Sequence, residues 1–255
     1  MNKQRLSTLG LIFITFLSAI QYVFLTHVPD TMPTFAFIGV TNLIGLVLMG
    51  AVFFKKLATL KKRTLFKGMV LAALLTAMNF FMVLGSKNTE TVIVSSLLSL
   101  YFIFVTPILL LLKKKVNFFS GIATMVAILA LLLMFGANTS DLFSSKNVIF
   151  LIICDIFFAG YVVSISVLGE EEDSTQLTLA QMLFAFLFST SGWLIESFVQ
   201  HREVSLPSDP GFWVGAVFIG IFIRAVYGMI QMYSQKHVSA LTASLIFSSE
   251  IIITL

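Results

Sequence analysis

The chain has 255 residues, of which 58% are hydrophobic and only 11% are charged. Soluble domains carry about 25% charged residues, so this composition excludes an ordinary water-soluble protein. Long apolar runs separated by short polar breaks indicate several membrane-spanning helices instead. The formal net charge of +4 implies no nucleic-acid partner, because the basic residues fall mainly on one predicted side of the membrane.

The polar breaks divide the chain into nine apolar segments, each near the ~20 residues that a helix needs to cross the hydrocarbon. The first has a basic start and an apolar core that is too long for a cleavable signal peptide. No loop is long enough to fold by itself, so we predict one all-α polytopic membrane protein. The predicted spans are 8–27, 33–54, 65–86, 89–112, 117–137, 147–168, 177–198, 211–233 and 239–255.

The Lys and Arg residues predict the orientation, since short cytoplasmic loops are enriched in them. With the N-terminus inside, twelve of the sixteen fall in the cytoplasm, three fall outside and Arg224 lies within a span. We therefore predict a multi-pass protein with a cytoplasmic N-terminus. The short loops and tails favour a bacterial inner membrane, which is the plasma membrane, with the membrane of a eukaryotic organelle as the alternative. The lipid bilayer is its expected surroundings. The acidic run 170–173 is expected to be a solvated loop.

Two segments resemble each other at an offset of 149 residues: KNTETVIVSSLLSLYFIFVT, residues 87–106, and KHVSALTASLIFSSEIIITL, residues 236–255. Each covers the fourth helix of a set of five. Because five is odd, two such halves would cross the membrane in opposite directions, as in many secondary transporters. We predict an inverted repeat of two five-helix halves, at 1–140 and 141–255. The identities are Lys87/Lys236, Ser95/Ser244, Ser99/Ser248 and Ile103/Ile252.

The second predicted half is shorter than the first. The first half continues past Thr106 through a fifth span to about Ala137, so the second half needs roughly thirty more residues to match it. We expect ten spans in the complete plan, about nine of them in this sequence, with the second half incomplete at its C-terminal end. A natural nine-span protein with its C-terminus outside is the alternative.

The end of the chain resembles a known family. The stretch YSQKHVSALTASLIFSSEIII, after a Gly- and aromatic-rich helix, resembles the EamA-like branch of the drug/metabolite transporter superfamily. In that family the fourth helix of each half carries an Ala/Ser-Leu-Ile stretch and then a Ser-Leu-Glu-Pro turn. Here Ala243-Ser244-Leu245-Ile246 and Ser248-Ser249-Glu250-Ile251 resemble the two parts.

Three positions depart from the family pattern. Ser249 stands where Leu is usual, Ile251 stands where Pro is usual, and Tyr101 stands where the first copy would have Glu. The resemblance covers the whole chain by span layout and about twenty residues per half by motif. It implies ten helices in two inverted repeats, a central substrate cavity and export of small metabolites or drugs.

Three ionisable residues, Asp155, Arg224 and Glu250, lie deep within predicted spans, where a charge costs ~3 kcal/mol or more. Arg224, Tyr227 and Gln231 recur at i, i+3 and i+7 and therefore share one helical face. Arg224 has two readings: it pairs with Glu250 or Asp155 and holds helices together, or it binds a carboxylate or phosphate of the substrate. In the second reading the spare carboxyl group titrates and couples transport to protons.

Uncharged polar residues add candidates for a cavity. Asn42, Asn79 and Tyr101 lie within spans, and amide and phenol groups find few local backbone partners there. Ser99 lies on a polar face of the fourth span, with hydrogen bonding between helices as its alternative role. Small residues at four-residue intervals, such as Gly68, indicate close packing of helices.

The sequence lacks the motifs of several rival classes. No HExxH, GxSxG or GxxxxGK[ST] motif occurs, so metalloprotease, serine hydrolase and ATP-driven pump lack support. The three His residues lie near span ends without metal-ligand spacing. We predict no enzyme, no metal and no cofactor.

The predicted function is a secondary transporter that exports a small metabolite or drug by alternating access. The alternative is a polytopic protein without transport activity, either an intramembrane enzyme that uses Asp155 with Glu250 or a scaffold or receptor. The substrate, the coupling ion and the oligomeric state stay open, with a homodimer as one option.

Overall fold

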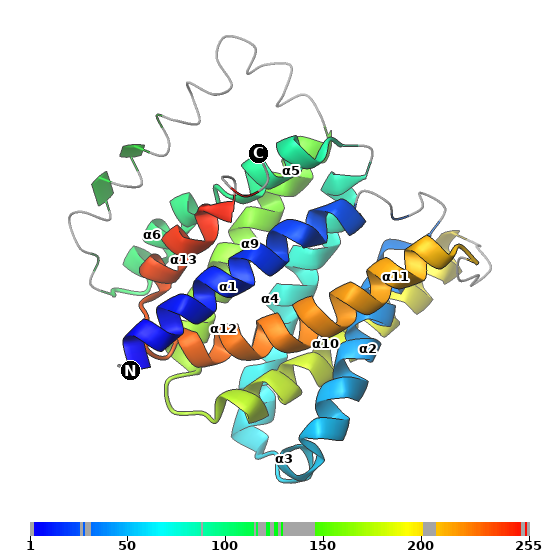
Figure 1. Cartoon of the computed structure of the whole chain (residues 1–255), viewed down its shortest axis with the longest axis horizontal. Coiled ribbons are helices and arrows are strands. Elements are labelled where there is room, and N and C mark those ends of the chain that lie inside the picture. The colour runs from blue at the N-terminus through cyan, green and yellow to red at the C-terminus, as the bar shows by residue number, and fades with distance from the viewer. Residues whose placement is uncertain are drawn as a thin grey trace.

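The computed structural model describes residues 3–25, 32–87, 89–114, 146–200 and 208–250, with the single positions 28, 116, 121, 122, 125, 126, 129 and 253. Every regular element within them is helical, and Figure 1 shows the long helices side by side in one bundle. In chain order the elements are α1 (Lys3–Leu25), α2 (Thr34–Val52), α3 (Phe54–Ala58), α4 (Lys62–Ser86), α5 (Thr91–Leu98), α6 (Phe102–Leu111), α9 (Lys146–Leu168), α10 (Ser174–Gln200), α11 (Pro210–Phe218), the π-helix η2 (Ile219–Tyr227), α12 (Gly228–Ser234) and α13 (Ala240–Ser248).

Seven helical segments of the described residues are long and apolar enough to cross a membrane, which confirms the predicted all-α polytopic class. The predicted span 117–137 lies largely outside the described residues, as do the end of the span 239–255 and the residues His27, Lys115, His201, Arg202 and Ile251. The seven segments are Lys3–Leu25, Thr34–Val52, Lys62–Ser86, Ile93–Leu111, Lys146–Leu168, Ser174–Val199 and Pro210–Ser234.

Two predicted spans are not continuous α-helices. The fourth is interrupted after Leu98, where the carbonyl of Leu97 accepts the N–H of Leu100 at 2.9 Å, and this i→i+3 bond tightens the chain for one turn. The eighth is one long helix whose middle, η2, is a π-helix. π-Helices are rare and are frequent at functional sites, and this one contains Arg224.

Small residues allow the helices that frame the centre to approach closely. A methyl group on Gly68 of α4 would lie 2.5 Å from the Cβ atom of Ala180 of α10. One on Gly220 of η2 would lie 2.7 Å from Ile44 of α2, and one on Gly45 of α2 would lie 2.8 Å from the Gly220 carbonyl oxygen. Such contacts are typical of helix packing in membranes, and they agree with the packing predicted for Gly68.

The two resembling segments have a common local structure. Helix α5 begins at Thr91 and α13 begins at Ala240, again 149 residues apart. The hydroxyl of Ser99 donates to the carbonyl of Ser95 at 2.7 Å, and the hydroxyl of Ser248 donates to that of Ser244 at 2.9 Å. These equivalent bonds agree with related segments, while the complete repeat stays a prediction.

Candidate functional site

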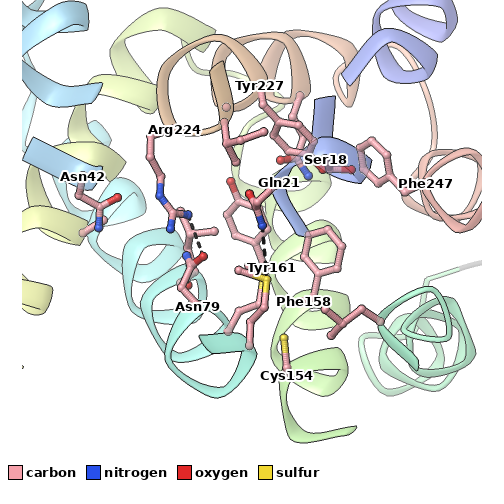
Figure 2. A pocket seen from close by; sticks show the side chains of 18 of the residues that line it. Ser18, Gln21, Asn42, Asn79, Cys154, Phe158, Tyr161, Arg224, Tyr227 and Phe247 are labelled. Carbon is pink, nitrogen blue, oxygen red and sulfur yellow. Dashed lines mark hydrogen bonds between the residues drawn. The ribbon is translucent and has the colours of Figure 1, made fainter. Parts of the chain in front are cut away.

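A cavity lies between the helices at the centre of the bundle. Figure 2 shows side chains from several helices pointing into it. Its walls come from α1, α2, α4, α5, α9, α10, η2, α12 and α13, so segments far apart in sequence meet there. The lining residues are Ser18, Gln21, Tyr22, Asn42, Leu75, Met78, Asn79, Met82, Leu98, Cys154, Phe158, Tyr161, Gln181, Met182, Ala185, Ile223, Arg224, Tyr227, Gly228, Gln231, Phe247 and Glu250.

Arg224 is the cationic side chain that lines this cavity, and only 7% of it is exposed. Its Nη1 atom donates to Oδ1 of Asn79 at 2.7 Å, the bond drawn in Figure 2, and its Nε atom donates to the hydroxyl of Thr41 at 3.4 Å. Both acceptors are neutral. The Nη2 atom is buried and has no hydrogen-bond partner among the described residues.

The backbone beneath Arg224 is held by the close approach of η2 and α2. A methyl group on Gly45 would lie 2.8 Å from the Cβ atom of Arg224. The guanidinium group is therefore fixed at its base by packing and at its end by Asn79. Because an arginine side chain loses considerable rotamer freedom when it is ordered, this support prepares the group to bind.

Glu250 is the anionic side chain of the cavity, and it is buried. It accepts hydrogen bonds from the hydroxyl groups of Ser18 and Tyr22, the latter at 3.3 Å. In Figure 2, Ser18 lies on the opposite side of the cavity from Arg224. Arg224 and Glu250 therefore have different hydrogen-bond partners in the cavity.

Aromatic and amide side chains form much of the remaining wall. The ring of Tyr227 stacks on that of Phe247 with centroids 5.9 Å apart. The hydroxyl of Tyr161 donates to Oε1 of Gln181 at 3.1 Å, whereas Nε2 of Gln231 has no partner among the described residues. The cavity therefore combines apolar surface with a small number of polar groups, as small-molecule sites usually do.

Six of the nine residues selected from the sequence line the cavity, and three do not. Asp155 is buried, and its Oδ1 atom has no partner among the described residues. Tyr101 donates its hydroxyl to the carbonyl of Ser244 at 3.0 Å, and Ser99 bonds to its own helix. The six that line the cavity are Asn42, Asn79, Arg224, Tyr227, Gln231 and Glu250.

The ion pair of Arg224 with Glu250 or Asp155, one of its two readings, is not formed among the described residues. No ion pair within 4.0 Å involves Arg224 in the described part of the chain. The reason is that the helices facing Arg224, α2 and α4, offer a hydroxyl and an amide oxygen rather than a carboxylate. The alternative of an Asp155–Glu250 dyad also lacks support, since Asp155 does not line the cavity with Glu250.

Several lining residues were missed from the sequence. Gln21 and Gln181 are amides within apolar runs, so the reasoning applied to Asn42 and Asn79 would have found them. Phe158 and Phe247 also line the cavity. No sequence signal distinguishes such residues from Phe residues that face lipid, because both environments are apolar.

The loops at one end of the bundle are joined by ion pairs. Asp173 pairs with Lys56 and Glu172 pairs with Lys67, both at 2.9 Å. Lys236 donates to the backbone carbonyl of Glu172. Three loops predicted to be cytoplasmic therefore meet on one side, and the acidic run is less solvated than expected at Glu172, whose side chain is 10% exposed.

The charges around this loop act on its carboxyl groups. Burial by itself would raise the pKa of Glu172, but hydrogen bonds from Thr64 and Lys67 and the nearby charges of Lys67 and Arg63 outweigh it and hold that pKa below its ordinary value. The same balance, with hydrogen bonds from Lys56, lowers the pKa of Asp173. Both groups are therefore ionised at neutral pH, and their ion pairs are formed.

Comparison with known families gives a match for the second part of the chain. Residues 145–255 match the EamA-like transporter family, which confirms the resemblance that the C-terminal motif predicted. Members of this family are membrane transporters of the drug/metabolite superfamily. No curated protein sequence matches the chain.

Proposed function

We propose that this protein is a secondary transporter that exports a small metabolite or drug across the bacterial plasma membrane. The observation that carries the proposal is the central cavity, in which helices from both predicted halves bring a fixed cation and a carboxyl group to the same space. Ionisable groups inside a membrane bundle usually mark a substrate or ion pathway. The family match supports the transporter class.

Alternating access is the mechanism that suits this arrangement. In transporters with inverted repeats, one half rocks against the other around a site near the middle of the membrane. The ion pairs of Lys56 and Lys67 with Asp173 and Glu172 join the loops at the predicted cytoplasmic end. Opening the cavity to the cytoplasm would require these contacts to separate, and closing it would restore them.

Glu250 is the proposed proton carrier. It lines the cavity, is otherwise enclosed by protein and is hydrogen-bonded to Ser18 and Tyr22. Carboxyl groups in such positions serve as proton relays in pumps and transporters. Loading from one side and release to the other would couple substrate movement to the proton gradient.

Flux measurements in everted membrane vesicles test this function. Pooled amino acids, nucleosides, organic acids and cationic drugs are followed by mass spectrometry, with and without a pH gradient. Glu250→Gln should abolish gradient-dependent flux, while Glu170→Gln, at an exposed loop position, should leave it unchanged. Equal flux in both variants would remove Glu250 from coupling, and the absence of flux for every compound would favour a membrane role other than transport.

A further inference from the structure

The charge of Arg224 has no carboxylate partner in the part of the chain that the structure describes. A guanidinium group keeps its proton in proteins, and the partners of this one, Asn79 and Thr41, are neutral. No carboxylate of the described residues lies within 4.0 Å of it. A buried charge is ordinarily paired. An anion that pairs with this guanidinium group would therefore have to be supplied by a ligand.

The free part of this cation is a hydrogen-bond donor. Nη1 and Nε of Arg224 are occupied, whereas Nη2 is buried and has no partner in the described part of the chain. Nε2 of Gln231, which lines the same cavity, also lacks a partner there. Buried donors left without acceptors are unfavourable. Both are satisfied by a ligand that supplies oxygen acceptors, and the charged one is best satisfied by an anion.

The surrounding wall restricts the charge and the body of that anion. Arg224 and Glu250 are the charged residues among those that line the cavity. With Glu250 protonated, Arg224 balances one negative charge, so a monoanion leaves the cavity neutral, whereas a dianion such as phosphate leaves an excess of one negative charge. Most other lining residues are apolar or aromatic, including Phe158, Met182 and Phe247, so the body of the ligand must be apolar.

We propose that the cavity binds the carboxylate of an apolar or aromatic monocarboxylic compound, with the carboxylate on Nη2 of Arg224. The proposal rests on the proposed transport function and specifies the substrate class of that same site. Asn79 is a positioning residue, because it orients the guanidinium group through Nη1 and leaves Nη2 without a partner among the described residues. A simple organic acid and an amino acid share this chemistry, and the test below distinguishes them.

The test is ligand binding to the purified full-length protein in detergent, measured by calorimetry and by the shift of its unfolding temperature. The probes are 3-phenylpropionate, its neutral amide, the corresponding 3-phenylpropylamine and the acid that carries an added 2-amino group. At least one of the two acids should bind ~10–100-fold more tightly than the amide. The reason is that a hydrogen bond between two charged groups is stronger than one to a neutral amide by about this factor in affinity. The ratio between the two acids shows whether an ammonium group is accepted.

Two variants of the site and one control complete the test. Arg224→Lys should weaken binding of the acid ~10–100-fold, because lysine lacks the planar fork. Asn79→Asp should abolish this binding while the protein remains folded, since an internal carboxylate then occupies the guanidinium group. Arg5→Gln removes an exposed arginine outside the cavity and should leave binding unchanged.

Two results would overturn the proposal: the amide or the amine binds the wild-type protein as tightly as both acids, or Asn79→Asp retains full binding of the acid. If either site variant does not fold, the comparison of acid with amide on the wild-type protein decides alone. Flux of a compound without a carboxylate, together with no binding of acids, would overturn this proposal and leave the transport function intact. Binding of an acid that is never transported would support this binding site and contradict the proposed transport function.

Discussion

The contact between α4 and α10 at Gly68 predicts a measurable loss of stability in Gly68→Ala. The added methyl carbon would lie 2.5 Å from Cβ of Ala180 and 2.9 Å from the backbone nitrogen of Gln181. Carbon atoms in contact are ~3.5–4.0 Å apart, so the two helices must separate by about 1 Å. Overpacking of this kind typically costs ~1–3 kcal/mol.

Gly160→Ala is the matched control. Gly160 also lies within a helix, α9, but the nearest atom to its added methyl group would be Cδ2 of Leu74 at 3.8 Å, an ordinary contact. Replacing glycine by alanine inside a helix stabilises by roughly 0.5–1 kcal/mol, and this gain cancels when the two variants are compared. Gly68→Ala should therefore be less stable than Gly160→Ala by ~1–3 kcal/mol.

Equilibrium unfolding in mixed detergent and dodecyl sulfate micelles, followed by tryptophan fluorescence, measures this difference. A second change, Ala180→Gly, should restore part of the loss in Gly68→Ala, because the methyl contact disappears while the backbone contact at Gln181 remains. The coupling of the two changes should be ~0.5–3 kcal/mol. Equal stability of Gly68→Ala and Gly160→Ala, within ~0.5 kcal/mol, would refute the close approach of α4 and α10.

Three further predictions concern groups near the ends of the spans. Glu196→Ala removes the acceptor of two backbone N–H groups at the start of α2, both at 3.1 Å, and should lower the unfolding free energy by ~0.5–2 kcal/mol; no change in the same assay would contradict this capping. Lys67→Ala should destabilise more than Glu171→Ala, because the side chain of Lys67 is 13% exposed and that of Glu171 is 69% exposed, and exposed pairs contribute only ~0–1 kcal/mol; the opposite order in unfolding experiments would refute the argument. The pKa of Glu172 lies below its ordinary value of 4.5, so the stability it contributes is complete above that pH and is lost as the pH falls through the folded pKa. The protection factors of the amide hydrogens in loop 169–173, which correct for the intrinsic pH dependence of exchange, should accordingly fall in acid, and Glu172→Gln should remove that fall.

Hydropathy was sufficient to predict the described spans, with ends that differ by no more than five residues. The reason is that a helix is the structure that satisfies every backbone group inside the hydrocarbon, so an apolar run of sufficient length has little alternative. The interruption at Ser99 and the π-helix around Arg224 were not predicted. Both depend on local hydrogen bonds and on neighbouring helices, which a count of apolar residues does not contain.

The candidate site was predicted in part for a related reason. The sequence indicated Arg224, Glu250 and Asn79, because a polar group within a membrane span is costly unless it faces the interior of the bundle or pairs with another group. For Arg224 the sequence left two readings open, and it did not indicate that Asn79 and Thr41 would be its partners. Which groups face it depends on the packing of η2 against α2 and α4, and the sequence alone does not specify that packing.

The neutral partner of Arg224 is itself informative about function. An aspartate at position 79 would differ from Asn79 in one atom and would give the guanidinium group a buried ion pair at the same 2.7 Å. Breaking or omitting such a pair leaves an uncompensated charge, which is unfavourable by several kcal/mol. Aspartate would also lose the hydrogen bond that Nδ2 of Asn79 donates to the carbonyl oxygen of Leu75 at 2.7 Å, and it would place a second acceptor beside that oxygen. The gained ion pair and this lost bond oppose each other in stability, so the expectation concerns function: Asn79→Asp should lower transport while the protein still folds. A folded variant that transports normally would show that the charge of Arg224 serves no ligand.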